Sequence, residues 1–426
     1  MDLMNQCREN LDYAIAVRRY LHEHPEPAAH ELQTVRFILA ELEKCGIEAV
    51  NVPDGGVLGF VRGALPGKTV MLRADCDALR MTEAAENAGG LPKAAVSKTA
   101  GIAHCCGHDL HTAMLLSAAG VLAENRGSLK GAVILMFERG EEGGGNIYYL
   151  HRYLQEQKIR VDACFAQHND PLLPAGTVAV SPGPRFAGSF GFQIRLTGRG
   201  GHGSRPDRGN NPIDCFLAIA MQFKDLRMRM IAPDVMFTAS INMVNAGTAH
   251  NIIPDSLTFS GTVRTYDFAS GLRFRDQFRK IIEKNCEMYE CGCEFLRWKG
   301  PTIPVVNQKE AAAFARTATA ACLGAANVTD TVPDLCSESF GVTSALYPSA
   351  MAAIGAGHAE ERFNVPLHSP RYDPNEEALL YGCAYYAACA LGFADADLRF
   401  DFQPFEEGLD ALFQLTNRPI PKHLDP

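Results

Sequence analysis

The sequence has no excess of basic charge and no long apolar run. Its 426 residues include 49 acidic and 40 basic side chains, which give a formal net charge of −9. A chain of this charge offers no overall positive field to a phosphate backbone, so we do not expect a nucleic-acid partner. No apolar stretch reaches the roughly 20 residues that a membrane helix needs. The richest stretch, residues 384–393, is interrupted early and predicts a buried helix, so no membrane partner is expected.

Two further absences bear on the cellular compartment. The first nine residues lack the basic start and apolar stretch of a secretory signal, and the 14 cysteines include no C-x-x-C pair. In a long chain of this kind we expect most cysteines to be reduced and buried. The sequence therefore predicts a cytoplasmic protein. Its content of 47% apolar and 21% charged residues is that of an ordinary globular chain.

Short apolar runs alternate with helical spacing in the first part of the chain. The runs lie at residues 57–61, 70–74, 133–137 and 161–166, with a helix expected at 111–122. Such alternation is typical of an α/β fold, in which a mostly parallel sheet is flanked by helices.

Prolines and glycines at residues 182–184 and 300–304 interrupt this pattern. Between the two interruptions the order of elements is β-α-β-β-α-β, which is typical of a ferredoxin-like unit. The α/β pattern resumes afterwards. We therefore predict one large domain formed by residues 1–185 and 300–426, with a smaller domain, residues 186–299, inserted into it.

Side chains that bind metals or accept protons follow the predicted strands. In an open α/β sheet, ligands bind beyond the carboxyl ends of the strands, so we expect these side chains to converge on one crevice. They are Asp75, Asp77, Cys106, His108, Asp109, His111, Glu141, Glu142 and His168.

Cysteine and histidine two residues apart, as at Cys106 and His108, supply a thiolate and an imidazole suited to zinc or a similar divalent metal. Glu141 and Glu142 stand on a glycine-rich turn, where one carboxylate can bind metal while its neighbour handles protons. Taken singly, these residues also fit a buried cysteine, a helix cap or a solvated acidic turn.

Two more histidines, His168 and His368, bring the candidate metal donors to five when they are added to Cys106, His108 and Glu142. Five donors exceed what one tetrahedral zinc uses, and they suit two metals that share a bridge. Either histidine taken alone is more often a hydrogen-bonded structural residue than a metal donor.

Seven motifs, in this order along the chain, carry a family resemblance. They are ADCDAL (74–79), CGHDLH (106–111), EEGGG (141–145), GGHGS (200–204), HNIIPD (250–255), GTVR (261–264) and HSP (368–370). With them the chain resembles the dinuclear-metal aminoacylase and carboxypeptidase G peptidase family. It is most similar to the amidohydrolase branch, which contains hippurate hydrolases and the N-acyl-amino-acid and indoleacetyl-amino-acid hydrolases. The resemblance runs from about residue 21 to residue 391.

The resemblance implies a catalytic domain with an inserted lid domain and two divalent metal ions per subunit, which would be Zn, Mn, Co or Ni. It implies that Cys106 bridges the two metals. His108 and His168 would complete one metal site, and Glu142 and His368 the other.

The implied activity is hydrolysis of the amide bond of an N-acyl amino acid, such as an N-acetyl or N-benzoyl derivative, to a carboxylic acid and a free amino acid. Glu141 would act as the general base and Asp77 would orient the metal donors. The alternative is a dipeptidase or carboxypeptidase that uses the same metal mechanism.

Three residues of the inserted domain also match the family's motifs. His202 would contact the scissile carbonyl, often across a dimer interface, and the resemblance implies a homodimer through the lid domain. Asn251 and Arg264 would hold the free carboxylate of the substrate, because the planar fork of an arginine can bind both carboxylate oxygens.

The sequence departs from the family at two places. Residues 138–140 are Glu-Arg-Gly where relatives tend to have Gln-Pro-Ala, and Ser339 stands where an aspartate is usual. We expect these changes to affect substrate contacts more than metal binding. His104 and His111 flank the metal motif and are candidates for contacts behind the metal donors.

Two rival functions can be formulated from single motifs. Residues 198–203 fit G-x-G-x-x-G, but no helix is expected before residue 212 and Asp225 falls within a helical stretch, so we exclude a dinucleotide site. A cysteine hydrolase with Cys106 as nucleophile stays open at this point, because cysteine and histidine form a known nucleophile and base pair.

Overall fold

The computed structural model describes residues 2–143, 145–394 and 396–416. These residues form two compact units, each described here by itself. The first unit holds residues 2–185, 306–332 and 342–409, and the second holds residues 186–305, 333–341 and 410–416. The chain passes between the units at β7 (Gly183–Phe186), β14 (Val305–Asn307), α9 (Gly341–Leu346) and α11 (Gly408–Leu415).

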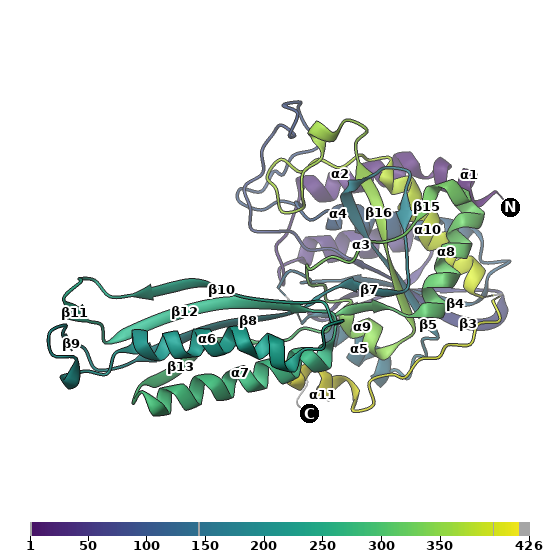
Figure 1. Cartoon of the computed structure of the whole chain (residues 1–426). Coiled ribbons are helices and arrows are strands. Elements are labelled where there is room, and N and C mark those ends of the chain that lie inside the picture. Colours follow the sequence, from purple (N-terminus) through teal and green to yellow (C-terminus); the bar gives the residue numbers. More distant parts are fainter. Residues whose placement is uncertain (1, 144, 395, 417–426) are drawn as a thin grey trace. The chain divides into compact units, whose positions relative to one another are not determined.

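The first unit is built on a sheet of eight strands in the order β1-β2-β4-β3-β5-β16-β6-β15 (Figure 1). The strands are β1 (Glu48–Val52), β2 (Gly56–Arg62), β3 (Leu65–Asp75), β4 (Lys130–Glu138), β5 (Ala163–Pro174), β6 (Val178–Ala179), β15 (Val328–Thr329) and β16 (Ser349–Gly357). The central run β4-β3-β5-β16 is parallel throughout. This arrangement confirms the predicted mostly parallel sheet flanked by helices.

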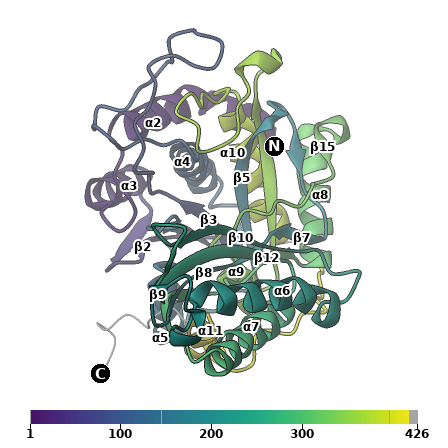
Figure 2. The ribbon, with the colours of Figure 1, turned by 60° about the vertical axis from the view of Figure 1, so that its left-hand side comes forward.

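Helices cover this sheet and bury its apolar side chains. They are α1 (Leu3–Glu9), α2 (Leu11–Glu23), α3 (Leu32–Lys44), α4 (His108–Glu124), α5 (Ile147–Glu156), α8 (Lys309–Leu323) and α10 (Ala378–Phe393). Helices α4 and α10 pack against each other and against β3 (Figure 2). Both are apolar around most of their circumference and almost wholly buried, as a helix enclosed between other layers must be. The N-terminus of α4 is thereby held rigidly near the end of β3.

Strand β5 is longer than the run predicted from the sequence. It continues to Pro174, so His168 lies within the strand rather than just after it. The pairing of β5 with β3, however, ends at Ala166, opposite Arg73. His168 therefore still lies past the part of β5 that pairs with β3, and its ring contacts Cys106 and the backbone oxygen of Asn169.

The second unit has the order β-α-β-β-α-β that the sequence predicts. Its elements are β8 (Gly188–Thr197), α6 (Pro212–Met230), β10 (Phe237–Ala246), β12 (Ser256–Thr265), α7 (Phe268–Met288) and β13 (Gly292–Lys299). The four strands pair antiparallel in the order β10-β12-β8-β13, and α6 and α7 lie side by side against them (Figure 1). A phenylalanine-rich core joins the helices to the sheet. The ferredoxin-like fold of this unit is confirmed.

Short elements complete the two units. They are β9 (Gly201–His202) and β11 (Ile252–Ile253), which pair with each other, and the 3-10 turns η1 (Pro206–Arg208), η2 (Ala325–Asn327) and η3 (Glu361–Phe363). Within the described ranges, no helix combines the length and the apolar character that crossing a bilayer requires.

Candidate metal centre

The first two metal donors are placed by the N-terminus of α4. Cys106 and His108 flank Gly107, which has a φ of +85° and forms the N-cap of the helix. A Cβ atom at this position would lie 2.4 Å from Oδ1 of Asn169, the neighbour of His168. Glycine is therefore required both for the left-handed backbone and for the close approach to β5. This turn brings Cys106 and His108 towards His168.

Donor atoms from four segments of the first unit meet at this point. The groups whose ligand atoms all lie within 4.8 Å of one another include Cys106, His108 and His168; Cys106, Glu142 and His368; and His108, Glu141 and Glu142. The first two groups share Cys106. The Cys106 Sγ is 3.8 Å from Nε2 of His168, close to the roughly 3.5 Å between a sulfur and a nitrogen on one tetrahedral zinc. Nε2 of His368 is 3.1 Å from Oε1 of Glu142.

The two buried histidines present the same ring nitrogen to this cluster. Nδ1 of His108 lies 3.0 Å from Oδ1 of Asp77, and Nδ1 of His168 lies 2.9 Å from the backbone oxygen of Asn169. Nε2 of His108 is buried and has no hydrogen-bond partner among the described residues. Imidazoles that bind metals use their second nitrogen for just such contacts, which fix the tautomer and the ring orientation. The residues therefore fit divalent metal ions.

Asp77 holds two parts of the site with its two carboxylate oxygens. Oδ1 contacts His108, and Oδ2 accepts a hydrogen bond of 2.9 Å from the backbone N–H of Glu142. The carboxylate is buried, with 1% of the residue exposed. A single side chain thus sets the distance between the helix that carries His108 and the loop that carries Glu141 and Glu142.

The thiol of Cys106 does not have the environment of a nucleophile. Burial raises its pKa well above the ordinary value, and the nearby His108 only partly opposes this effect. A nucleophilic cysteine needs a lowered pKa, whereas a thiol that binds a metal is deprotonated by the cation itself. The buried imidazole of His168 has a pKa well below its usual range because of burial and the neighbouring His111, so it stays neutral and can donate a lone pair. These properties favour metal binding over the cysteine-hydrolase alternative.

A ladder of buried polar groups lies behind the donors, and the sequence analysis foresaw little of it. Nδ1 of His111 is 2.6 Å from Asp75, and its Nε2 is 2.6 Å from Oδ1 of Asn169. Arg73 donates to Asp75 over 2.8 Å and to Glu138 over 2.8 Å. Although burial favours the neutral acid, the charges of His108, Arg73 and His111 hold the pKa of Asp75 well below its usual range. Glu138, one of the family departures, is therefore one half of a buried ion pair.

Of the two flanking histidines, only His111 is seen in contact with this ladder. His104 is buried as well, and its Nδ1 has no hydrogen-bond partner among the described residues. Burial lowers the pKa of His104 to about 3, so the ring is neutral in the folded protein.

A second buried network ties α4 to the segment that carries His368. Its members are Arg18, His22, Glu83, Lys93 and Asp109. The His22 ring lies 2.8 Å from both carboxylates, and Lys93 donates to Glu83 over 2.8 Å. Lys93 also donates to the backbone oxygen of Pro370 over 3.0 Å, two residues after His368. His368 itself has a φ of +62°, and its N–H donates to Cys105.

The three predicted residues of the inserted domain lie in the second unit. His202 on β9 and Asn251 beside β11 are both exposed. They lie close together, because the N–H of Gly203 donates to the backbone oxygen of Asn251 over 2.8 Å. The hydroxyl of Ser204 lies 2.8 Å from Nδ1 of His202. Arg264 on β12 is partly buried, burial lowers its pKa, and no carboxylate of the described residues pairs with it.

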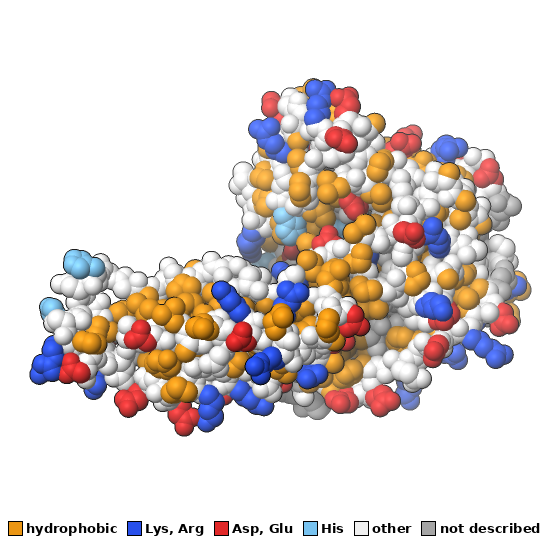
Figure 3. Space-filling model, in the orientation of Figure 1, with side chains coloured by type: hydrophobic (Ala, Val, Ile, Leu, Met, Phe, Trp, Pro, Cys, Tyr) orange, Lys and Arg blue, Asp and Glu red, His pale blue; other side chains and the backbone are white. Residues whose placement is uncertain are grey.

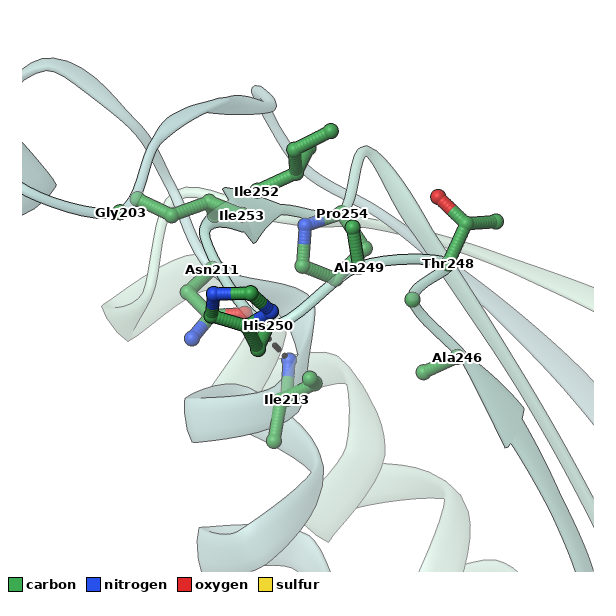
Figure 4. Close-up of a pocket in the computed structure, with 11 residues that line it drawn as sticks. Gly203, Asn211, Ile213, Ala246, Thr248, Ala249, His250, Ile252, Ile253 and Pro254 are labelled. Carbon is green, nitrogen blue, oxygen red and sulfur yellow. Dashed lines mark hydrogen bonds between the residues drawn. The ribbon is translucent and has the colours of Figure 1, made fainter.

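A hollow of about 600 Å³ lies beside His202 and Asn251 in the second unit (Figure 4), whereas Arg264 lies at the other end of β12. Figure 4 shows the His250 ring next to Asn211 and Ile213 at the start of α6, with alanine, isoleucine and proline side chains around it. Apart from His250, its lining carries no ionisable side chain. The hollow therefore lacks the donors and the proton acceptor that the cluster of the first unit combines.

Comparison with known sequences places this site in a family. The model of peptidase family M20/M25/M40 matches residues 71–392. The thermostable carboxypeptidase 1 of Saccharolobus solfataricus is 33% identical over 92% of this chain and 98% of its own length. The IAA-amino acid hydrolase ILR1-like 4 of Arabidopsis thaliana is 32% identical over 89% and 85%. The N-acetylcysteine deacetylase of Bacillus subtilis is 33% identical over 88% and 96%.

Solved structures agree with this placement. The YxeP protein of Bacillus subtilis, described as a dinuclear metal binding peptidase from the M20 family, matches with a TM-score of 0.74 and 29% identity. The match covers 91% of this chain and 99% of that one. A structure from methicillin-resistant Staphylococcus aureus matches with a TM-score of 0.81 and 26% identity over 93% of this chain and 100% of its own.

The geometry of Asp77 leads to a testable prediction. In Asp77→Asn the amide lacks the negative charge that polarises His108, and one of its two contacts must be lost because only one of its atoms accepts hydrogen bonds. We expect metal affinity to fall by about 10- to 100-fold. Titration against a chromophoric chelator measures this change, with the exposed Asp12→Asn on α2 as the control. Unchanged affinity in Asp77→Asn would contradict the role assigned to this carboxylate.

Proposed function

The chain belongs to peptidase family M20/M25/M40, and on that premise we propose that it hydrolyses the amide bond of N-acyl amino acids to a carboxylic acid and a free amino acid. It is a metal-dependent amidohydrolase. One observation carries the proposal. Two groups of candidate donors have Cys106 in common, and the carboxylate of Glu141, which belongs to neither group, lies next to them.

We assign two divalent ions to each subunit, and Cys106 would be a donor to both. His108 and His168 would complete one site, and Glu142 and His368 the other. The mixture of thiolate, imidazole and carboxylate donors suits borderline metals, so Zn, Mn, Co and Ni are the candidates. When bound, such ions supply Lewis acidity, which polarises the amide carbonyl and eases the deprotonation of water.

Glu141 is the general base in this proposal. Its carboxylate takes a proton from the attacking water and returns it to the nitrogen of the leaving amino acid, so that the amine departs neutral. Asp77 keeps His108 and the Glu142 backbone in place while this proton moves.

The substrate class rests on the relatives and on one arginine of the second unit. Two of the relatives are named as hydrolases of acylated amino acids. The partly buried Arg264, which pairs with no carboxylate of the described residues, suits the free carboxylate of an amino acid. Asn251 lies beside His202 at the other end of β12, so it would assist from the partner subunit. Carboxypeptidase relatives keep dipeptides as the alternative substrates. Both substrate classes end in the same free carboxylate.

We further propose that residues 186–299 serve as a lid and dimerisation domain between the two catalytic segments, residues 1–185 and 300–426. Its edge strand β10 and the helix α6 expose Leu217, Met221, Met228, Met243 and Val244. Figure 3 shows apolar side chains gathered over this part of the second unit. An apolar edge strand beside an apolar helix face is a surface that a second copy would cover. His202 would then act on the substrate bound by the partner subunit.

The cytoplasm is the compartment that fits this proposal. The described cysteines form no disulfide although several of them are partly exposed, as in proteins kept in a reducing environment.

The direct test of the general base is the variant Glu141→Ala. We expect its turnover of N-acetyl and N-benzoyl amino acids to fall by about 10²- to 10⁴-fold, because proton transfer from water loses its acceptor. Metal content by elemental analysis should stay at the wild-type level. Glu156→Ala, an exposed glutamate on α5, is the matched control. Retained turnover in Glu141→Ala would refute the assignment.

Metal removal separates this mechanism from a cysteine hydrolase. We expect a chelator to abolish turnover and added Zn, Mn, Co or Ni to restore it, with about two ions bound per chain. Activity that survives chelation but is lost on alkylation would instead identify Cys106 as a nucleophile.

The proposed dimer is tested by the variant Met221→Lys. Met221 is 70% exposed on α6, and a buried lysine at an interface is unfavourable, so dimer affinity should drop tenfold or more. Analytical ultracentrifugation measures this change. The control is Met288→Lys, a similarly exposed methionine at the end of α7. A wild-type protein that sediments only as a fully active monomer would contradict both the dimer and the role of His202 across it.

A further inference from the structure

The loop that carries the two catalytic carboxylates is held by an ion pair that lies outside the metal cluster. Glu31 is the residue before α3, and none of it is exposed; Arg139 follows β4 and is 5% exposed. Nε of Arg139 donates to Oε2 of Glu31 over 2.9 Å. Nη2 of Arg139 donates to the backbone oxygen of Ala29 over 2.9 Å. The guanidinium thus joins the start of α3 to the end of β4.

The same carboxylate also binds the backbone of the catalytic loop. Oε1 of Glu31 accepts hydrogen bonds from the N–H of Gly140 over 2.8 Å and from the N–H of Ala29 over 2.9 Å. Gly140 has a φ of +68°, and a Cβ there would lie 2.9 Å from the Asn146 side chain. The backbone before Glu141 is therefore held in one unusual conformation by a buried acid.

The backbone on the other side of Glu141 is held in a parallel way. The N–H of Glu142 donates to Oδ2 of Asp77 over 2.9 Å. The amides on either side of Glu141, those of Gly140 and Glu142, are thus each bonded to a buried carboxylate. With both neighbouring amides fixed, the direction in which the Glu141 side chain leaves the loop is fixed as well.

Glu31 accepts these hydrogen bonds best as an ionised carboxylate, and Arg139 supports that state. Burial and the charge of the nearby Asp77 raise the pKa of Glu31, while the Arg139 guanidinium opposes them. Without the guanidinium, the buried Glu31 would be protonated more readily. Its hydrogen bonds to the loop would then be weaker.

We propose that Glu31 and Arg139 form a positioning pair that fixes the Glu141 carboxylate relative to the metal donors. The pair touches neither substrate nor metal and acts through the loop. Arg139 stands where the family resemblance expects proline, which could neither form the ion pair nor donate the N–H that Arg139 gives to Gly55 over 3.0 Å. The inference rests on the proposed function, because it presumes that Glu141 is the general base.

Disrupting the Glu31–Arg139 pair should lower turnover without weakening the binding of metal or substrate. A displacement of about 1 Å at a reacting group costs about 100-fold in rate. We expect Arg139→Gln to lower kcat by tenfold or more, with KM within twofold of wild type and metal content unchanged. Arg139→Lys keeps the charge but lacks the planar fork that reaches both Glu31 and the backbone oxygen of Ala29. Its kcat should therefore lie between those of the wild type and Arg139→Gln.

Steady-state kinetics on the wild type and these variants, with elemental analysis of each, form the test. Arg275→Lys is the matched control, because Arg275 is also an almost buried arginine that bonds a carboxylate and backbone oxygens, but it lies in the second unit. If Arg139→Gln fails to fold, Glu31→Gln/Arg139→Gln removes both charges and should show the same selective loss of kcat.

Four outcomes distinguish the hypotheses. A kcat of Arg139→Gln within twofold of wild type overturns the positioning pair, and so does a loss of kcat that merely follows a loss of metal. A wild type that is inactive on acylated amino acids and dipeptides alike contradicts the proposed function instead. A fall in kcat alone, graded from Arg139→Lys to Arg139→Gln, supports the pair.

Discussion

The carboxylate of Asp77 is the contact on which the rest of the site depends. One of its oxygens holds the imidazole of His108, at the start of α4, and the other holds the backbone of Glu142, after β4. The two segments lie on different strand ends of the sheet, and this buried acceptor between them links both directly. Because the acid is almost fully buried, its hydrogen bonds face little competition from water.

Around this contact, buried acids lie beside basic side chains. Asp75 and Glu138 both contact Arg73, Asp109 contacts Arg18, and Glu31 contacts Arg139. Buried ion pairs contribute little net stability, but breaking one is costly because it leaves an uncompensated charge. Such pairs make a rigid frame, and a rigid frame is what a site needs when several metal donors and one proton acceptor must keep fixed distances.

Part of the candidate donor set could be predicted from the sequence because its chemistry is local. Cys106 and His108 lie two residues apart, and Glu141 and Glu142 are adjacent, so these residue types indicate metal and proton chemistry. His168 and His368 are distant in sequence, and their roles were implied by the family resemblance; the structure brings both within reach of Cys106. The α/β fold of the first unit and the ferredoxin-like fold of the second could also be predicted, because the order of apolar runs along the chain indicates both. The frame behind the donors could not be predicted, because its partners are distant in sequence: Glu31 and Arg139 are separated by 108 residues. No spacing or periodicity links such a pair, and each member alone looks like an ordinary surface charge. Similarly, the length of β5 depends on its pairing with β16, which only the folded sheet determines.

If Cys106 is a donor to two metal ions, anomalous X-ray diffraction from crystals of the metal-loaded enzyme, collected at the absorption edge of the bound metal, should show both. We expect two peaks about 3.5–4 Å apart, with the Cys106 Sγ about 2.3 Å from each. A single peak, or two peaks with Cys106 bound to neither, would contradict this assignment.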